Sequence, residues 1–313
     1  MAVPTDTGHT EEKVFRAYSS EQGRHYASAR TAYPQVVYDT VVDFHTTTGG
    51  HFGTIMDVGC GPGPVVRKLA TKFEHATGVD PSPGMIESAT ILGGLSGSSK
   101  PIDFVVSRAE TLEGIADSSI DLVTVAAAAH WFDMTEFWPR LAQVVRPGGT
   151  VAVWSSSAKM PHSSNPNATA LTKLLTNLTD NDLEPHMARG NKIGRSRYSE
   201  LLLPWTIDHP VPEFDAASFQ RLIWVPEGEA VQEGELAVPI ETLTMDDLER
   251  IADTMSPITR WREAHPDLAG TERDLVKASR RKIEAVLSEG GAQSDNLVLR
   301  MTSPGVLLLF KRV

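Results

Sequence analysis

The sequence predicts an α/β fold in which a doubly wound, mostly parallel sheet carries a mainly helical insertion. Three observations lead to this prediction. Short β-rich runs alternate with helical segments from about residue 35 to 155, a glycine-rich turn follows the first run, and the alternation stops after Trp154. Ligands of open α/β sheets bind outside the carboxyl ends of the strands, so we expect functional residues at those ends.

The elements of the core follow in chain order. Apolar, β-branched runs predict strands over 54–58, 76–80, 102–106, 122–126 and 150–154. Helices are expected between them near 64–73, 83–91 and 134–145. Pro64 suits the first turn of a helix, where its missing N–H costs little.

The remainder of the chain predicts a cap and a return to the core. Residues 156–295 are rich in helical segments, although 219–225 could add a strand. Residues 296–301 and 306–310 predict two strands joined by a four-residue turn, an antiparallel edge hairpin that brings the sheet to seven strands. We therefore divide the chain into a core (1–155), a cap or substrate insertion (156–295) and a C-terminal hairpin (296–313).

Composition limits the classes of function. A net charge of −11 and a pI near 5.4 disfavour a nucleic-acid partner and favour a small-molecule substrate. No apolar run approaches the roughly 18 residues that cross a bilayer, and the lone Cys60 permits no internal disulfide, so we expect a soluble, cytoplasmic protein without a membrane partner. The ten histidines lack metal-ligand spacing, so no metal is expected, and no G-x-S-x-G elbow indicates a hydrolase. Oligomeric state is left open.

The turn Asp57-Val-Gly-Cys-Gly-Pro-Gly63 is the most informative segment. Its glycines allow a tight turn and close approach of a ligand to the backbone, ahead of a helix N-terminus. Asp80 closes the next strand about twenty residues on, where ribose hydroxyls are held in such folds. An adenosine-containing cofactor is predicted. NAD is disfavoured because Pro64 occupies the position of the third fingerprint glycine, and ATP because no Gly-Lys-Ser/Thr follows.

With these residues in place, the chain resembles the class I S-adenosylmethionine-dependent methyltransferases over about residues 10–155. Their first motif, D-x-G-x-G-x-G, is present, and later landmarks follow in order: Gly78-Val-Asp-Pro-Ser-Pro-Gly-Met-Ile86, Ala109-Glu110, Asp121-Leu-Val-Thr-Val125 and Val145-Arg-Pro-Gly-Gly149. Two shorter strings, Tyr26-Ala-Ser-Ala-Arg-Thr-Ala-Tyr-Pro34 and Ala129-His-Trp-Phe132, resemble the trans-aconitate methyltransferase-like branch of fungal enzymes.

The resemblance implies a Rossmann-like methyltransferase fold, S-adenosylmethionine as cofactor and a role for each landmark. Asp57 and the three glycines would surround the methionine end of the cofactor, and Asp80 would accept hydrogen bonds from the ribose. The other cofactor-binding residues implied are Pro81, Ser82 and Met85 beneath the adenine, Ala109 and Glu110 at its edge, and Tyr26, Arg30 and Tyr33 on an N-terminal helix that closes over it. Packing of the two tyrosines against the core, with Arg30 on the rim, is an equally good interpretation of that helix.

Methyl transfer is an in-line displacement that depends on alignment and exclusion of water. His130 is the best-placed candidate base, although it could instead orient the acceptor or pack structurally, and Trp131 could shield the methyl group or belong to the core. A carboxylate acceptor needs no base. For an acidic acceptor the cap would supply a cation, and the candidates are Arg195, Arg197, Arg221 and Arg260.

The leading hypothesis is O-methylation of a carboxylate on a small organic acid or secondary metabolite. Methylation of a phenol, nitrogen or carbon centre with the same cofactor is the nearest alternative. A non-catalytic cofactor-binding regulator and a nicotinamide oxidoreductase are further alternatives from other classes.

Overall fold

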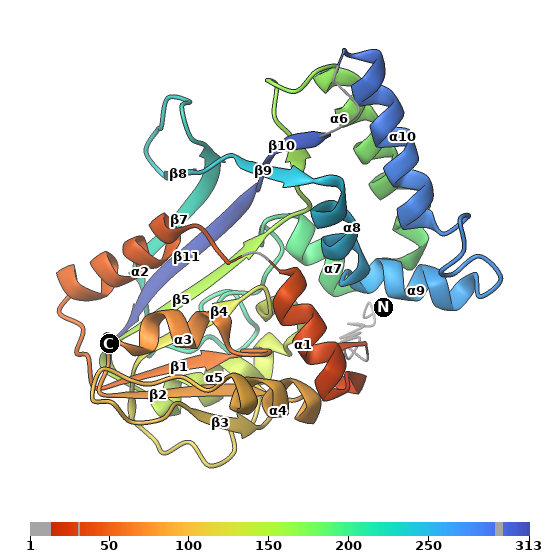
Figure 1. Ribbon diagram of the computed structural model, residues 1–313. Helices are drawn as coiled ribbons and strands as arrows, with labels where there is room; N and C mark the ends of the chain where they lie inside the picture. Colours follow the sequence, from red (N-terminus) through yellow and green to blue (C-terminus); the bar gives the residue numbers. More distant parts are fainter. Residues whose placement is uncertain (1–13, 31, 292–296) are drawn as a thin grey trace, which may run out of the picture.

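A computed structural model describes residues 14–30, 32–291 and 297–313. Residue 296, where the last predicted pair of strands begins, and the first residues of the predicted core lie outside these ranges. An eight-stranded sheet of order β3-β2-β1-β4-β5-β11-β7-β8 forms the centre, with helices on both faces (Figure 1). The predicted doubly wound α/β class is confirmed, with one strand more than the predicted seven.

The first five strands are parallel neighbours and agree with the predicted runs. Their bounds are β1 Thr54–Val58, β2 His75–Asp80, β3 Asp103–Val106, β4 Ile120–Ala126 and β5 Val145–Ser156. The connecting helices are α3 Pro64–Ala70, α4 Pro83–Leu92 and α5 Met134–Val144, preceded by α1 Ser20–Ala29 and α2 Gln35–Thr47. Pro64 and Pro83 occupy the first turns of α3 and α4, as their lack of an N–H favours.

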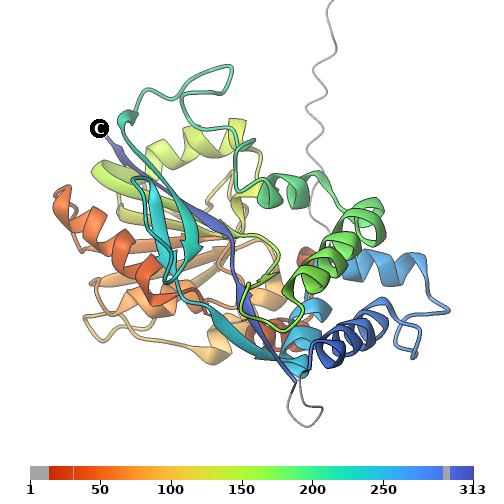
Figure 2. The ribbon, with the colours of Figure 1, turned by 90° about the horizontal axis from the view of Figure 1, so that it is seen from above.

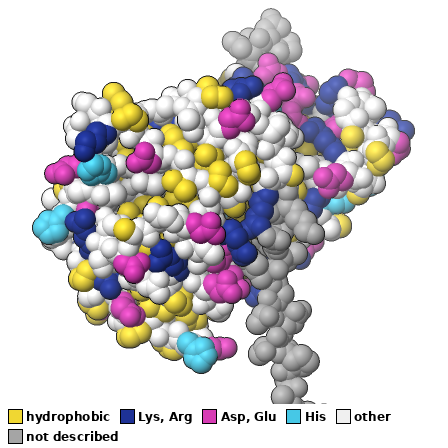
Figure 3. All heavy atoms as spheres, turned by 90° about the horizontal axis from the view of Figure 1, so that it is seen from below, with side chains coloured by type: hydrophobic (Ala, Val, Ile, Leu, Met, Phe, Trp, Pro, Cys, Tyr) yellow, Lys and Arg dark blue, Asp and Glu magenta, His cyan; other side chains and the backbone are white. Residues whose placement is uncertain are grey.

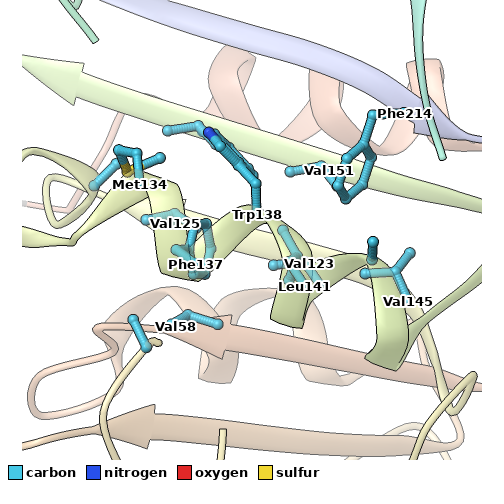
Figure 4. Packing of buried hydrophobic residues seen from close by; sticks show 14 of the residues in the cluster. Val58, Val123, Val125, Met134, Phe137, Trp138, Leu141, Val145, Val151 and Phe214 are labelled. Carbon is cyan, nitrogen blue, oxygen red and sulfur yellow. The ribbon is translucent and has the colours of Figure 1, made fainter. Parts of the chain in front are cut away.

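Alternation along the strands divides the core between two faces. Ile55 of β1 packs with α2 and α3, whereas Met56 and Val58 belong to the opposite cluster with α5. In that cluster Phe137 and Trp138 of α5 are fully buried and lie against the valines of β4 and β5 (Figure 4). The indole N–H of Trp138 donates to the carbonyl of Leu202 at 2.9 Å, so its one polar atom is satisfied.

The second half of the chain enters the sheet more deeply than predicted. β7 Phe214–Pro226 and β8 Glu235–Val238 extend the main sheet, and β7 contains the predicted run 219–225. β11 Gly305–Arg312 lies between β5 and β7, antiparallel to both, so it is a central strand and not an edge strand. The predicted hairpin is wrong in its pairing, because β10 Val298–Thr302 joins a separate three-stranded sheet with β6 Met160–Pro161 and β9 Glu241–Thr244.

Helices of the cap gather at one end of the molecule, beyond the carboxyl ends of the parallel strands (Figure 1, Figure 2). They are α6 Ala168–Asn177, α7 Arg189–Arg195, α8 Met245–Asp253, α9 Ser256–Ala264 and α10 Leu275–Glu289. A small core of their own, which includes Leu171, Ile283 and Leu287, packs against Leu299 and Met301 of β10. Contact with the cap thus explains why the residues of β10 are alternately buried and exposed. The same contact holds the cap over the sheet edge.

Candidate active site

A cavity of about 670 Å³ lies between the carboxyl ends of the central strands and the cap. Residues of the loops after β1, β2, β4 and β5 line one side, and residues of α6, α8, α9 and α10 line the other. Its volume lies within the range of small-molecule and cofactor sites. The cavity therefore lies at the sheet edge where we expected ligand-binding residues.

The turn after β1 has the conformation that its glycines permit. Gly59, Gly61 and Gly63 have φ of +69°, +53° and +80°, values that side-chain-bearing residues rarely adopt. Gly59 and Gly61 line the cavity. A Cβ on Gly61 would meet no protein atom within 4 Å, whereas one on Gly63 would collide with Phe104. Gly61 thus keeps cavity space open, and Gly63 allows close packing at the start of α3.

Asp57 is buried at the end of β1 and faces the cavity. The hydroxyl of Thr124, on the neighbouring strand β4, donates to its Oδ1 at 2.7 Å. Burial raises the pKa of Asp57 to about 7, although the Thr124 hydrogen bond lowers it. A buried carboxylate of this kind is stabilised by a cation, and an ammonium group in the cavity would supply one.

Asp80 connects two loops of the site. Its Oδ2 accepts the N–H of Gly61 and its Oδ1 accepts the N–H of Ser82, each at 2.9 Å. Burial raises the pKa of Asp80 to about 6, against the effect of these two hydrogen bonds. Each carboxylate oxygen keeps a lone pair for a further donor, which the two hydroxyls of a ribose could provide.

Most, but not all, of the residues predicted to contact the adenine line the cavity. Pro81, Met85, Ala109 and Glu110 line the cavity, whereas Ser82 is buried and caps α4 by accepting the N–H of Met85. Both oxygens of Glu110 are engaged, Oε1 by the N–H of Asp133 at 2.9 Å and Oε2 by Arg108 at 3.3 Å. Glu110 therefore also fixes the loop that leads into α5.

The N-terminal segment closes the cavity from a third side. Tyr26, Arg30 and Tyr33 all line it. Arg30 lies over the ring of Tyr26, 5.2 Å from its centroid, and donates to the carbonyl of Thr254 in the cap at 3.3 Å. Tyr33 packs edge-on against Trp154, with 5.6 Å between ring centroids. The segment thus packs on the core and borders the cavity, and its role in closing over a cofactor stays a prediction. α1 ends at Ala29, so Tyr33 lies outside the helix that was predicted to carry it.

His130 and Trp131 follow β4 and also line the cavity. The Nδ1 of His130 forms a hydrogen bond with the hydroxyl of Tyr198 at 2.9 Å, and its ring packs beside Trp131 with 4.8 Å between centroids. Burial lowers the pKa of His130 to about 3. The imidazole is therefore neutral at physiological pH and a weak base, which favours the orienting or packing role over proton removal.

Only one of the four predicted arginines reaches the cavity. Arg195 lines it and pairs with Asp180. Arg221 donates to the carbonyls of Arg197 and Tyr198, at 2.5 and 3.4 Å, so Arg197 and Arg221 stabilise a cap loop outside the cavity. Arg260 donates to the carbonyl of His186 at 2.7 Å and also lies outside. The guanidinium of Arg221 donates to backbone carbonyls, and that of Arg260 donates to one carbonyl and to the side chains of Asn191 and Ser256.

Sequence reasoning missed the polar residues on the far side of the cavity. Lys159, Glu241 and Ser303 all line it and contact one another. They come from three distant segments, and none lies in a motif. A half-buried lysine just after a strand end at the ligand edge is the one signal that could have drawn attention to them.

The described residues contain neither a metal-binding cluster nor a membrane-spanning helix. Within them no three His, Cys, Asp or Glu side chains come together as a metal site. Across the described ranges no helix is both long and apolar enough to cross a membrane. Charges of both signs are interspersed on the face seen from below (Figure 3).

Comparison with known proteins identifies the domain that builds this site. Residues 56–153 match the family model described as a methyltransferase domain. The matched region runs from β1 into β5 and contains the glycine turn, Asp80, Glu110 and His130.

Curated relatives agree over the same region. The chain is 33% identical over 127 residues to a methyltransferase of Claviceps purpurea, covering 41% of this chain and 39% of the relative. It is 34% identical over 125 residues to the methyltransferase nsrG of Aspergillus novofumigatus, covering 39% and 46%. It is 29% identical over 133 residues to CRG1 of Saccharomyces cerevisiae, a candidate S-adenosylmethionine-dependent methyltransferase, covering 42% and 45%. These matches span less than half the length of each relative.

A solved structure extends the likeness to the whole fold. A candidate type II methyltransferase from Anaeromyxobacter dehalogenans superposes with a TM-score of 0.59 over 90% of this chain and 97% of that chain, at 22% identity. The methyltransferase fold therefore includes the second half of the chain, whose sequence lies outside the matched domain.

Proposed function

We propose that this protein is an S-adenosylmethionine-dependent methyltransferase that methylates an oxygen of a small molecule, and that the oxygen belongs to a carboxylate. The observation that carries the proposal is that Asp57 and Asp80, at the ends of adjacent strands, both line the cavity beside the glycine turn, where Asp80 accepts the N–H of Gly61, in a region that matches a methyltransferase domain. The organic-acid chemistry of the trans-aconitate methyltransferase-like branch, suggested by residues 26–34 and 129–132, agrees with it.

The residues present fit the cofactor. Asp57 offers a buried carboxylate to the ammonium group at the methionine end of the cofactor. The open space at Gly61 allows that end of the cofactor to lie close to the backbone. Asp80 offers lone pairs to the ribose hydroxyls, and Met85 offers soft apolar contact to the adenine. When bound, the cofactor supplies an electrophilic methyl group on a positively charged sulfur.

Strand order favours an acceptor position beside the cofactor. Along the sheet edge β2 and β1 carry the proposed cofactor residues, and β4 and β5 come next with His130, Trp131 and Ser155–Lys159 around the cavity. An acceptor oxygen in front of β4 would bond to the methyl carbon that the bound cofactor supplies, and the electron pair of the C–S bond would stay on sulfur. A carboxylate would become an ester in this step and has no proton to give up.

The neutral state of His130 favours a carboxylate over a phenol. A base with a pKa of about 3 is poorly matched to a phenol, whose pKa is about 10. A carboxyl acceptor with a pKa of about 4 is already ionised near neutral pH. His130, which is hydrogen-bonded to Tyr198, then orients the acceptor and does not take its proton.

Incubation with methyl-labelled S-adenosylmethionine tests the proposal. Panels of aryl and alkyl carboxylic acids, phenols and amines would be compared, and we expect label in an acid product that is released by mild base. The His130→Asn variant should keep turnover of the same acid with an unchanged pH profile, because no proton passes through the ring. Label in a phenol ether or an amine would overturn the carboxylate assignment. Tight cofactor binding without turnover of any panel would indicate a regulator.

A further inference from the structure

The cap side of the cavity is mainly apolar. Its walls include Leu175, Leu178, Met245, Ile251, Met255 and Ile283. An acceptor that fills this space must present apolar surface over most of its length, because burying its polar groups without partners would be costly.

One buried polar group interrupts this wall. The Oγ of Ser303 lies 2.9 Å from the Nζ of Lys159 and 2.8 Å from Oε1 of Glu241, and Lys159 and Glu241 form an ion pair. Side-chain exposure is 17% for Lys159 and 25% for Glu241, and Ser303 is 5% exposed. We call these three residues the polar trio.

The other charged groups on the cap wall differ in their surroundings. Arg195 pairs with Asp180, and their side chains are 41% and 45% exposed. Arg280 bridges Asp246, Glu249 and Glu284, which accept from its Nε and from one terminal nitrogen. It links α8 to α10, and Asp246 is 75% exposed. This cluster stabilises the cap surface, which leaves the polar trio as the better site for ligand recognition.

The polar trio is neutral as a whole and has hydrogen-bonding capacity left. Lysine has three N–H donors, and the contacts with Glu241 and Ser303 use two. The second carboxylate oxygen of Glu241 has no described protein donor among these contacts. A neutral group that both donates and accepts, such as a hydroxyl, fits this pair of free positions. An anionic group would meet the charge of Glu241, and a purely apolar group would leave Lys159 unsatisfied.

Position along the sheet edge sets the length of the acceptor. Lys159 follows the end of β5, and Ser303 precedes β11, two strands from β4, where His130 lies. Neighbouring strands are about 4.8 Å apart, so the start of β11, next to Ser303, lies about 10 Å along the edge from the end of β4.

We propose that Lys159, Glu241 and Ser303 bind a neutral hydroxyl-like group at the far end of an elongated, mainly apolar acceptor, and thereby position its carboxylate for methylation. This inference rests on the proposed function. The three residues are positioning residues, since they lie away from the reacting atoms.

Calorimetry on protein saturated with S-adenosylhomocysteine tests the proposal. The probes are straight-chain acids of eight to twelve carbons with and without a terminal hydroxyl, and naphthoic acid with and without a hydroxyl on its distal ring. At least one hydroxylated acid should bind about tenfold more tightly than its parent, as expected for a hydrogen bond to charged groups. Lys159→Met and Glu241→Gln should abolish this preference.

The matched control is Lys192→Met. Lys192 pairs with Glu184 at 2.6 Å outside the cavity, so this variant loses an ion pair of the same kind and should keep the preference. Ser303→Ala, a smaller change, should reduce the preference partly. Thermal unfolding confirms that each variant is folded.

Three results would overturn the inference: no preference for the hydroxylated acids, a preference that survives in Lys159→Met, or no binding of any acid to the saturated protein. Affinity for S-adenosylhomocysteine itself should be equal in all variants. Failure of the wild-type protein to bind S-adenosylhomocysteine would contradict the proposed function, and is thus distinguished from failure of the acceptor assignment.

Discussion

Asp80 holds two backbone N–H groups from two different loops with one carboxylate. The same residue that shapes the site is therefore proposed to bind the ribose. Asparagine keeps one of these two acceptor oxygens and removes the charge, so Asp80→Asn loses one loop hydrogen bond as well as the charged acceptor.

Asp80→Asn should weaken binding of S-adenosylhomocysteine by about 1–3 kcal/mol, because charge-assisted hydrogen bonds to the ribose are lost. Calorimetry at neutral pH measures the change. Asp103→Asn, an exposed residue at the start of β3, is the control and should bind as the wild type does. Equal affinity in the Asp80 variant would remove the ribose assignment.

At this scale the sequence predicted where the proposed cofactor residues gather, but not which residues of the cap border the cavity. Asp57, Gly61, Asp80 and Met85 lie within thirty residues of sequence, each tied to a strand end, so local pattern placed them correctly in the cavity. The polar trio joins residues from three segments that are far apart in the sequence. Contacts of that range follow from how the cap docks, which no local pattern contains.

Among the elements, the turn between β1 and α3 shows how one backbone conformation serves two purposes. Gly61 and Gly63 both have positive φ, yet a Cβ at position 61 would enter open cavity and one at position 63 would strike Phe104 at 2.8 Å. The first glycine favours ligand binding and the second favours packing.

Gly61→Ala should therefore lose affinity for S-adenosylhomocysteine by more than about tenfold while its cost in folding stability stays near 1–2 kcal/mol, the cost of the strained backbone. Urea unfolding and calorimetry measure the two effects. Gly114→Ala is the matched control, with φ of +79° and no atom within 4 Å of the added Cβ, and it lies outside the cavity. It should show a similar stability cost and unchanged binding; similar binding losses in both variants would contradict the role of Gly61.

The strands of the core were predictable because each is a short apolar run between turn residues. The hairpin was predicted wrongly because adjacency in sequence was taken for pairing. Every residue from Gly305 to Lys311 is buried, and a continuous apolar run of this kind indicates a central strand. β10 alternates between buried and exposed residues, the pattern of a strand with one covered face. That contrast was present in the sequence.

For the whole molecule, two buried acids at one site make stability depend on pH. Folding raises the pKa of Asp57 to about 7 and of Asp80 to about 6, above the ordinary value near 4. Between those values the folded protein binds more protons than the unfolded chain, so the contribution of these acids to stability is greatest at low pH and declines as pH rises through about 7.

The free energy of unfolding of Asp57→Asn should accordingly fall less than that of the wild type between about pH 5 and pH 8. Urea titrations across this range measure it, with Asp103→Asn as the control. S-adenosylhomocysteine should reduce the wild-type decline, because its ammonium group stabilises the ionised Asp57. Parallel pH profiles for the wild type and Asp57→Asn would show that the buried acid is not coupled to folding.

The central position of β11 has a consequence for biosynthesis. Its partners β5 and β7 are translated long before it, and until it appears each of them has an unpaired, largely apolar edge. The nascent chain therefore exposes two unpaired strand edges while the intervening helices are synthesised. Unpaired edges favour binding of chaperones and pairing with neighbouring chains. Ribosome-bound intermediates of this protein should be more prone to aggregate than the released polypeptide.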